Sequence, residues 1–219
     1  MTPTRRAILA GGAGFGVLAL GGVGLTRFIN TASGPGAATG AEADAQVQAV
    51  LFDPDQPVLG NPQGDVTVAE FFDYQCPFCK RGHEDLMAEV EADGNVRLIM
   101  KDWPIFGGSS VMASQMVLGA IASEDYAAAQ AALMATPARL SDDDVRRTLT
   151  EAGFDPEALL TSYRQDRERW DGLISRNGQQ ASGIGLQGTP AFIVGRTVHA
   201  GAMDRTALHG AIAAARAAS

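Results

Sequence analysis

The sequence predicts an α/β protein in which helices flank a central mixed sheet and a helical block interrupts the sheet-forming chain. Three observations support this class. An apolar, β-prone run at 66–74 precedes a helical pattern at 76–92, and a second apolar run follows at 96–100. The stretch from 109 to about 180 is helical in character. Two short strand-like runs and an amphipathic helix then close the chain, which completes helices on both faces of a small sheet.

The first strand, helix and strand have recognisable boundaries. Turn-forming residues at 61–65 precede the run at 66–74. Pro77 lies just inside the expected helix start, where its missing N–H does no harm. The helix is expected to end at 93–95, where Asp-Gly-Asn is typical of a C-cap and turn. Because a strand–helix–strand unit uses a right-handed crossover, we expect the strands at 66–74 and 96–100 to pair in parallel.

The remaining elements are predicted from helix-start signals and from the change from a helical to a strand-like pattern of apolar residues near 191. Residues 141–144 and 155–157 place acids in the first turn of a helix, so the block contains several helices. The run at 191–194 is a short strand, and 197–199 is expected to pair with it as an antiparallel hairpin. A helix at 203–218 ends the chain.

The first residues have the layout of an export signal. Arg5 and Arg6 precede an uncharged run at 7–25 that contains seven glycines. This pattern resembles the twin-arginine signal, with a general secretory signal as the alternative. The run is also long enough to span a hydrocarbon core of about 30 Å, so an uncleaved inner-membrane anchor is a further alternative. We assign 1–29 to this signal or anchor, and 30–54 to a flexible linker and short lead-in.

Charge and cysteine content narrow the function. The net charge of −8 argues against nucleic acid or an anionic membrane as the main partner. The two cysteines, Cys76 and Cys79, lie three positions apart. A disulfide between them would close a tiny loop and contribute little chain-entropy stabilisation. A role in a chemical reaction therefore explains this pair better than a structural disulfide does.

A C-x-x-C pair at a helix start suits thiol–disulfide exchange. Cys76 is expected at or beside the N-cap, exposed, where the helix dipole favours its thiolate as the nucleophile. Cys79 follows one turn later, partly shielded, and suits the resolving thiol. No metal and no cofactor beyond a Cys76–Cys79 disulfide is expected.

A metal-binding module is the alternative use of the same cysteines. His83 is four residues after Cys79 and thus on the same helix face, which makes a trio with Cys76 conceivable. Soft sulfur ligands would favour copper(I) or zinc. An isolated histidine on a helix is, however, more often solvated surface, and this is our expectation for His83.

Two motifs resemble the DsbA-like periplasmic disulfide oxidoreductases. These are residues 70–80, Glu-Phe-Phe-Asp-Tyr-Gln-Cys-Pro-Phe-Cys-Lys, and residues 188–195, Gly-Thr-Pro-Ala-Phe-Ile-Val-Gly. The resemblance covers about 55–217. It implies a thioredoxin-like fold formed by 55–104 and 182–217, with an inserted helical domain at 105–181. It also implies a periplasmic protein that exchanges disulfides with unfolded or partly folded exported proteins and has a possible membrane redox partner.

The resemblance implies roles for individual residues. Thr189 and Pro190 match the cis-proline loop that lies beside the dithiol and, with Pro77 and Phe78, faces the substrate chain. Glu70 matches the buried acid that relays protons to the resolving cysteine, and burial raises the pKa of such a carboxyl.

Two further expectations concern the surroundings of these residues. Lys101, at the end of the next strand, is either the partner of Glu70 or exposed. The apolar residues at 103–106 are expected to be packed inside, with an apolar rim near the dithiol as the alternative.

Departures from the family pattern leave the redox direction open. The best-known strong oxidant carries Pro-His between its cysteines, whereas this chain carries Pro77 and Phe78. Threonine before the cis-proline occurs in isomerases and reductases as well as oxidases. Too few residues precede the first strand for a dimerisation domain, so we expect a monomer, although a short helix at 45–51 could pair.

Overall fold

The computed structural model describes residues 40–137 and 139–219, so the expected export signal at 1–29 lies outside the described residues. None of the described helices combines the length and apolar character that a membrane span requires. In chain order the helices and strands are α1 (Gly40–Leu51), β1 (Val58–Gly60), β2 (Val66–Phe72), α2 (Pro77–Asp93), β3 (Val96–Asp102), α3 (Gly108–Gly119), a 3₁₀ turn (Ala120–Ser123), α4 (Tyr126–Met134), α5 (Asp142–Glu151), α6 (Pro156–Gln165), α7 (Arg167–Gly183), β4 (Ala191–Val194), β5 (Thr197–Ala200) and α8 (Arg205–Ala217).

The strands of the described chain form one five-stranded mixed sheet in the order β1-β3-β2-β4-β5. β2 pairs in parallel with β3, as the crossover rule predicts, and β4 pairs antiparallel with both β2 and β5. The central position of β2 gives it a hydrogen-bonded neighbour on each side. Side chains on both of its faces are also covered, so nearly every residue of β2 is buried.

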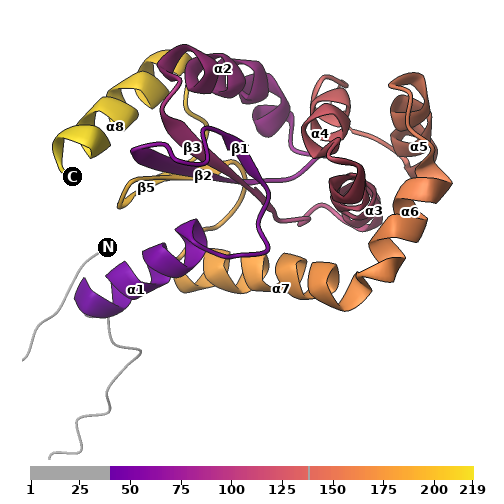
Figure 1. The fold of residues 1–219 in the computed structure, drawn as a ribbon, viewed down its shortest axis with the longest axis horizontal. Coiled ribbons are helices and arrows are strands. Elements are labelled where there is room, and N and C mark those ends of the chain that lie inside the picture. Colours follow the sequence, from indigo (N-terminus) through magenta and orange to yellow (C-terminus); the bar gives the residue numbers. More distant parts are fainter. Residues whose placement is uncertain (1–39, 138) are drawn as a thin grey trace, which may run out of the picture. The chain divides into compact units, whose positions relative to one another are not determined.

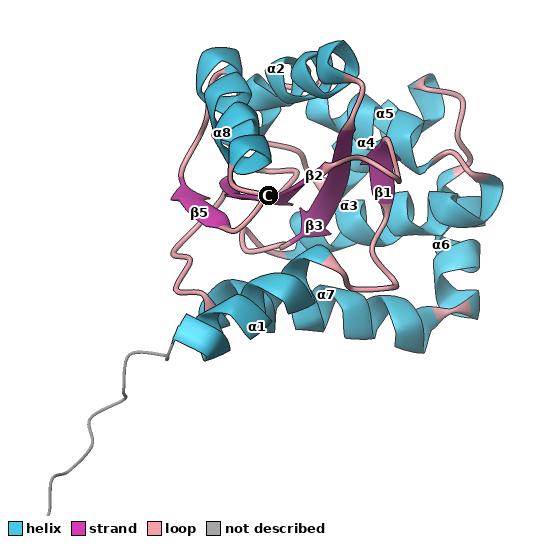
Figure 2. Ribbon diagram, turned by 60° about the vertical axis from the view of Figure 1, so that its left-hand side comes forward, coloured by secondary structure: helices cyan, strands magenta, loops and turns pink. Residues whose placement is uncertain are grey.

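Helices cover both faces of the sheet (Figures 1 and 2). Helices α2 and α8 lie on one face, and α1 and α7 lie on the other. The first face belongs to a large core cluster that includes Val68, Phe72, Met100 and both cysteines. The second face belongs to a smaller cluster that includes Phe71 and Ile99. Successive residues of β2 therefore point to opposite faces, as strand geometry requires.

The helices α3 to α6 form a block beyond one end of the sheet (Figure 1). Helices α3 and α6 approach each other closely at Gly119 in α3, where an added Cβ would lie 2.1 Å from the carbonyl oxygen of Leu159 in α6. Only glycine permits this approach, because any Cβ would overlap that oxygen. The helix starts at 141–144 and 155–157 are confirmed: Ser141 forms a capping box with Asp144, and Asp155 accepts from two N–H groups.

The structure differs from the sequence expectation before β2. Residues 40–44, which were predicted as linker, begin helix α1, and the helix continues through the short helix considered at 45–51. Val47, Val50 and Leu51 are buried in the second core cluster. The spacing of these three residues places them on one helix face. Strand β1 was not predicted; it is three residues long and pairs antiparallel with β3.

Candidate functional site

The turn between β2 and α2 places the two cysteines at a helix start. Cys76 is the N-cap of α2, with extended backbone, and its N–H donates to the Asp73 carbonyl at 2.9 Å. The backbone N–H of Cys79 donates to the Cys76 sulfur at 3.4 Å. Pro77 occupies the first turn, where a missing N–H removes no helical bond. The Cys76 sulfur therefore lies among the N–H groups that begin the helix.

The loop before β4 reaches the same sulfur. The Thr189–Pro190 peptide bond is cis, and the Thr189 carbonyl oxygen lies 3.2 Å from the Cys76 sulfur. This juxtaposition follows from the sheet, because β4 begins directly after Pro190 and pairs with β2, which ends just before the cysteines. The two motifs, more than a hundred residues apart in sequence, meet at one sulfur atom.

Cys76 is less accessible than expected. The sequence predicts an exposed thiol, but Cys76 and Cys79 are both only 1% exposed. The prediction of exposure is wrong in this structure, because the close approach of Thr189 adds to the cover that the helix start already gives. Phe78, between the cysteines, is 53% exposed, and the Arg81 guanidinium lies over its ring at 4.5 Å. Both sulfurs are thus buried, whereas the aromatic side chain between them is exposed.

The pKa values of the two thiols are shifted in opposite directions. Hydrogen bonding from the Cys79 side chain lowers the pKa of Cys76 from 9.0 to about 5, and the backbone N–H groups of Cys79 and Phe78 act in the same direction against the opposing effect of burial. Burial raises the pKa of Cys79, and the hydrogen bond to Cys76 and the charge of Glu70 add to that increase. At neutral pH, one sulfur is a thiolate and its neighbour keeps its proton.

Glu70 lies beneath the cysteines in the middle of β2. It is 2% exposed, and its Oε2 atom has no hydrogen-bond partner among the described residues. Burial, with a smaller effect of the Cys76 charge, raises the pKa of Glu70 from 4.5 to about 8. The buried position of this acid agrees with the sequence expectation, and its carboxyl carries a proton at neutral pH.

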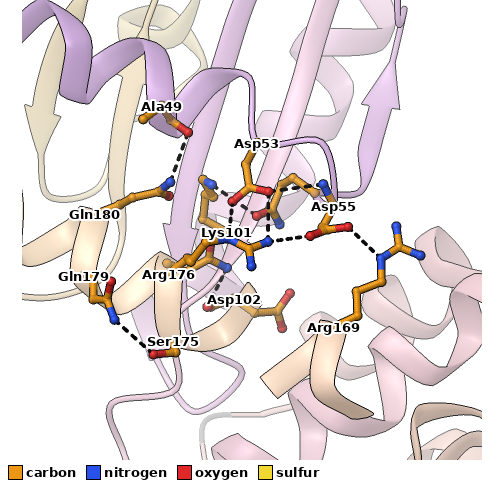
Figure 3. A network of polar contacts seen from close by, with 12 residues as sticks. Ala49, Asp53, Asp55, Lys101, Asp102, Arg169, Ser175, Arg176, Gln179 and Gln180 are labelled. Carbon is orange, nitrogen blue, oxygen red and sulfur yellow. Dashed lines mark hydrogen bonds and ion pairs between the residues drawn. The ribbon is translucent and has the colours of Figure 1, made fainter. Parts of the chain in front are cut away.

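Lys101 is not the partner of Glu70. In the parallel register Glu70 lies opposite Met100, so Lys101 points to the other face of the sheet. There its ammonium group donates to the Gln56 side chain at 3.2 Å, near the ion pair of Asp53 with Arg176 (Figure 3). Lys101 is fully buried, and burial lowers its pKa to about 8. Both expectations for this lysine, pairing with Glu70 and exposure, are wrong.

Asp73 organises the loops around the dithiol and was missed by the sequence analysis. Its carboxylate accepts four hydrogen bonds at 2.7–3.0 Å, which come from the N–H groups of Gln75, Ile105 and Phe106 and from the Ser110 hydroxyl. An acid between an apolar strand and the first cysteine was the available signal. These bonds bring the exposed side chains of Ile105 and Phe106 toward the cysteine turn, so the expectation that both are packed inside is wrong.

Gln75 joins the cysteine turn to the helical block. Its side chain donates to the Leu140 carbonyl at 2.6 Å and accepts from the Leu140 N–H at 2.7 Å, and all of these atoms are buried. Lys80 adds a second connection through its hydrogen bond to the Thr136 hydroxyl at 2.7 Å. The position of the dithiol is therefore fixed by the sheet and by the block together.

The histidine of the metal alternative is buried. His83 is 9% exposed rather than solvated as expected, and burial lowers its pKa to about 4. It lines a cleft between α2 and α4, together with Pro77 and Met134. Within residues 40–137 and 139–219, no three His, Cys, Asp or Glu side chains are grouped as metal ligands. The trio of Cys76, Cys79 and His83 is thus not assembled in the described chain.

A thioredoxin family model matches residues 53–214, about three quarters of the chain. The chain belongs to the thioredoxin family. Within this family it is similar to a thioredoxin-like oxidoreductase from Silicibacter pomeroyi DSS-3, with 37% identity, coverage of 78% of this chain and 98% of that one, and a TM-score of 0.74. The catalytic domain of Proteus mirabilis ScsC is 26% identical, with coverage of 80% and 97% and a TM-score of 0.71.

Two further comparisons show a shared fold and a partial sequence match. The thiol–disulfide exchange protein alpha-DsbA2 of Wolbachia pipientis is 23% identical, with coverage of 81% of this chain and 99% of that one and a TM-score of 0.71, and shares the fold. Disulfide bond formation protein D of Bacillus subtilis (strain 168) is 36% identical over 74 residues. That match covers 32% of this chain and 31% of the curated relative, so it spans about a third of that protein.

Proposed function

We propose that this thioredoxin-family chain is a thiol–disulfide oxidoreductase that acts on exported proteins through Cys76 and Cys79. The observation that carries the proposal is the position of the Cys76 sulfur at the N-cap of α2, with Cys79 one turn later and its N–H at 3.4 Å from that sulfur. The low pKa of Cys76, about 5, agrees with this position. Exchange needs one sulfur that attacks or leaves as an anion and a second sulfur close enough to resolve the mixed disulfide.

The geometry supports a balanced exchange in two steps. A substrate thiolate attacks the sulfur of Cys76 in the oxidised enzyme, the Cys76–Cys79 bond breaks, and Cys79 leaves with its electron pair. Glu70 gives that sulfur a proton, because a carboxyl with a pKa of about 8 holds one at neutral pH. A second substrate thiolate then attacks the mixed disulfide, and Cys76 leaves as the stable thiolate. The substrate is oxidised and the enzyme dithiol is reduced.

The surroundings of the dithiol suit an unfolded or partly folded polypeptide. Thr189 and Pro190 hold the substrate backbone beside the sulfur, and Pro77 and Phe78 contact its side chains. The exposed side chains of Phe78, Ile105 and Phe106 offer apolar surface near the reacting group. The twin-arginine-like signal at 1–29 and the family relationship support a periplasmic location, where such substrates occur.

The acidity of Cys76 favours the oxidising direction. A thiolate that is stable at neutral pH lowers the free energy of the reduced enzyme, and this makes the disulfide a stronger oxidant. A membrane redox partner would then restore the disulfide. Titration of the dithiol against glutathione measures this direction: a potential above that of the glutathione pool supports oxidation, and one well below it supports reduction.

The function is tested with the two single cysteine variants. The wild-type chain is expected to reduce insulin and to oxidise a reduced model protein. Cys76→Ser removes the nucleophile and is expected to abolish both activities. Cys79→Ser keeps the nucleophile and is expected to accumulate a mixed disulfide with substrate, detected by mass. Full activity of Cys76→Ser, or no mixed disulfide with Cys79→Ser, would refute the proposal.

A further inference from the structure

Asp73 holds two loops against each other at the dithiol. It directly follows β2, lies three residues before Cys76 and is buried. Its backbone carbonyl accepts the Cys76 N–H at 2.9 Å. The Oδ2 atom of its carboxylate accepts the N–H groups of Ile105 and Phe106 at 2.7 and 3.0 Å. One residue therefore fixes the backbone of the nucleophilic cysteine and the backbone of the loop between β3 and α3.

The loop between β3 and α3, residues 103–107, is tied at its start, in its middle and just beyond its end. The Trp103 N–H donates to the Phe72 carbonyl at 2.9 Å. The two bonds to Oδ2 of Asp73 hold the middle. The hydroxyl of Ser110, in the first turn of α3, donates to Oδ1 of Asp73 at 2.7 Å. The path of the loop is thus set by hydrogen bonds to the two residues that lead into the cysteine turn.

The two carboxylate oxygens of Asp73 divide their donors between different segments. Oδ2 accepts only from the loop at 103–107, whereas Oδ1 accepts from the Gln75 N–H and the Ser110 hydroxyl, each at 2.7 Å. Hydrogen bonds to a charged acceptor are stronger than those between neutral groups. A buried carboxylate at this position therefore holds the loop and the cysteine turn at a fixed separation.

The side chains that these bonds position are apolar and exposed. Ile105 is 40% exposed and Phe106 is 44% exposed. The described chain exposes five large apolar side chains, and three of them, Ile105, Phe106 and Phe78, lie in this loop and at the start of α2 beside the cysteines. Exposed apolar side chains that gather in one region of a soluble protein indicate a binding surface. Because burial would stabilise both loop side chains, contact with a partner explains their exposure better than stability does.

We propose that Asp73 is a positioning residue that fixes an apolar lip beside the dithiol, formed by the side chains of Ile105 and Phe106. The lip selects substrate cysteines that are flanked by a large apolar side chain. The inference rests on the proposed exchange function and names the substrates that it prefers. A substrate chain held in extended form beside Cys76 directs its successive side chains to opposite sides. An apolar neighbour of the reacting cysteine then covers the lip, whereas a serine in its place does not.

The test uses two synthetic peptides that differ only in the residues on either side of a single cysteine, which are phenylalanine in one peptide and serine in the other. Each cysteine is activated as its mixed disulfide with thionitrobenzoate. The Cys76 thiolate of the reduced enzyme attacks the peptide sulfur, and thionitrobenzoate, the better leaving group, departs as a thiolate that is followed by absorbance. Cys79 then attacks the new mixed disulfide. The Cys76–Cys79 bond forms, and the peptide leaves as a thiol with the proton of Cys79.

The measured quantity is the preference, defined as the apparent second-order rate constant for the phenylalanine peptide divided by that for the serine peptide. With reduced enzyme in excess, the wild type is expected to show a preference of about fivefold, the effect of burying roughly half of an aromatic side chain. Asp73→Ala releases the lip, and its preference is expected to fall below about twofold. The loss should appear as a higher half-saturating enzyme concentration for the phenylalanine peptide, with the maximal rate retained. Ser110→Ala is the matched control, because it removes a bond to the same carboxylate and leaves both bonds to the lip, so its preference should equal that of the wild type.

A second pair of variants tests the lip without altering Asp73. Phe106→Ser removes the aromatic ring of the lip and is expected to lower the preference as Asp73→Ala does. Phe52→Ser is its control, because Phe52 is also an exposed aromatic residue beside an arginine but lies outside both loops, and the preference should stay at the wild-type value.

An unchanged preference in Phe106→Ser, or equal losses in Asp73→Ala and Ser110→Ala, would overturn the inference. If Asp73→Ala does not fold, Phe106→Ser decides by the same criterion, since that position is exposed. Equal rates of the wild type with both peptides would also overturn the lip and leave the exchange function standing. Failure of the proposed function is a different result, in which the wild type releases thionitrobenzoate from neither peptide faster than Cys76→Ser does.

Discussion

The ionisation of Cys76 predicts how the stability of the reduced protein depends on pH. The perturbation is Cys76→Ser, which keeps the size of the side chain nearly constant and removes its charge. The pKa of Cys76 is about 5 in the folded chain against an ordinary 9.0. A group whose folded pKa is depressed contributes stability that is present above the unfolded pKa. That stability is lost as pH falls through the folded pKa.

The magnitude follows from this difference. Between the two pKa values, the free energy of unfolding of the reduced wild type rises relative to Cys76→Ser by about 1.4 kcal/mol per pH unit. From pH 5 to pH 7 the difference in unfolding free energy between the reduced wild type and Cys76→Ser is expected to grow by about 2.5 kcal/mol. Glu70 stays protonated in both proteins throughout this window, because its pKa of about 8 lies above the window and loss of the neighbouring thiolate affects it only secondarily.

Urea unfolding of both reduced proteins at several pH values, followed by tryptophan fluorescence, measures this difference. Cys79→Ser is the control: its hydroxyl can still donate to the Cys76 sulfur, so we expect the slope to persist. A difference that stays constant within about 0.5 kcal/mol from pH 5 to pH 7 would refute the assigned acidity of Cys76.

Three further predictions concern the surroundings of the dithiol. Glu70→Gln is expected to slow protein disulfide exchange about a hundredfold by removing the proton carrier. In the oxidised state it should also gain stability over the wild type as pH rises from 4.5 toward 8, since a raised folded pKa makes the wild type lose stability there; urea unfolding checks this. Gln75→Ala leaves two buried backbone groups unpaired and is expected to cost about 2 kcal/mol, whereas the exposed Gln179→Ala should change the unfolding free energy by less than about 0.5 kcal/mol. Gly119→Ala forces a Cβ against a backbone carbonyl of α6 and is expected to lower the thermal midpoint by more than any surface Gly→Ala change, such as Gly210→Ala in α8.

The elements that the sequence predicts well are those whose pattern is local. Strand β2 and helix α2 carry their own turn, cap and proline signals, and the parallel pairing of β2 with β3 follows from a rule of chain geometry. Helix α1 was harder because its first half is rich in small residues that are typical of linkers. Its helical state depends on packing of Val47 and Val50 against the sheet, and the sequence does not display that contact.

The site shows the same division between local and long-range information. The order of the two cysteines along a helix start was readable, and so was a buried acid at Glu70. The direction of Lys101 depends on the register between two strands, and a shift of one residue reverses it. The burial of Cys76 depends on a loop more than a hundred residues away. No pattern near the cysteines encodes such contacts.

The hydrogen bonds of Asp73 and Gln75 have a consequence for hybrid proteins. Asp73 binds Ser110 in α3, and Gln75 binds Leu140 between α4 and α5, so the turn that carries the cysteines is joined to the helical block at two places. A chimera that borrowed this block from a relative would need matching polar atoms at both positions, or the catalytic turn would lose its supports. The cysteine turn and the helical block should therefore be inherited together. In libraries of shuffled relatives, active recombinants are expected chiefly where both segments come from the same parent.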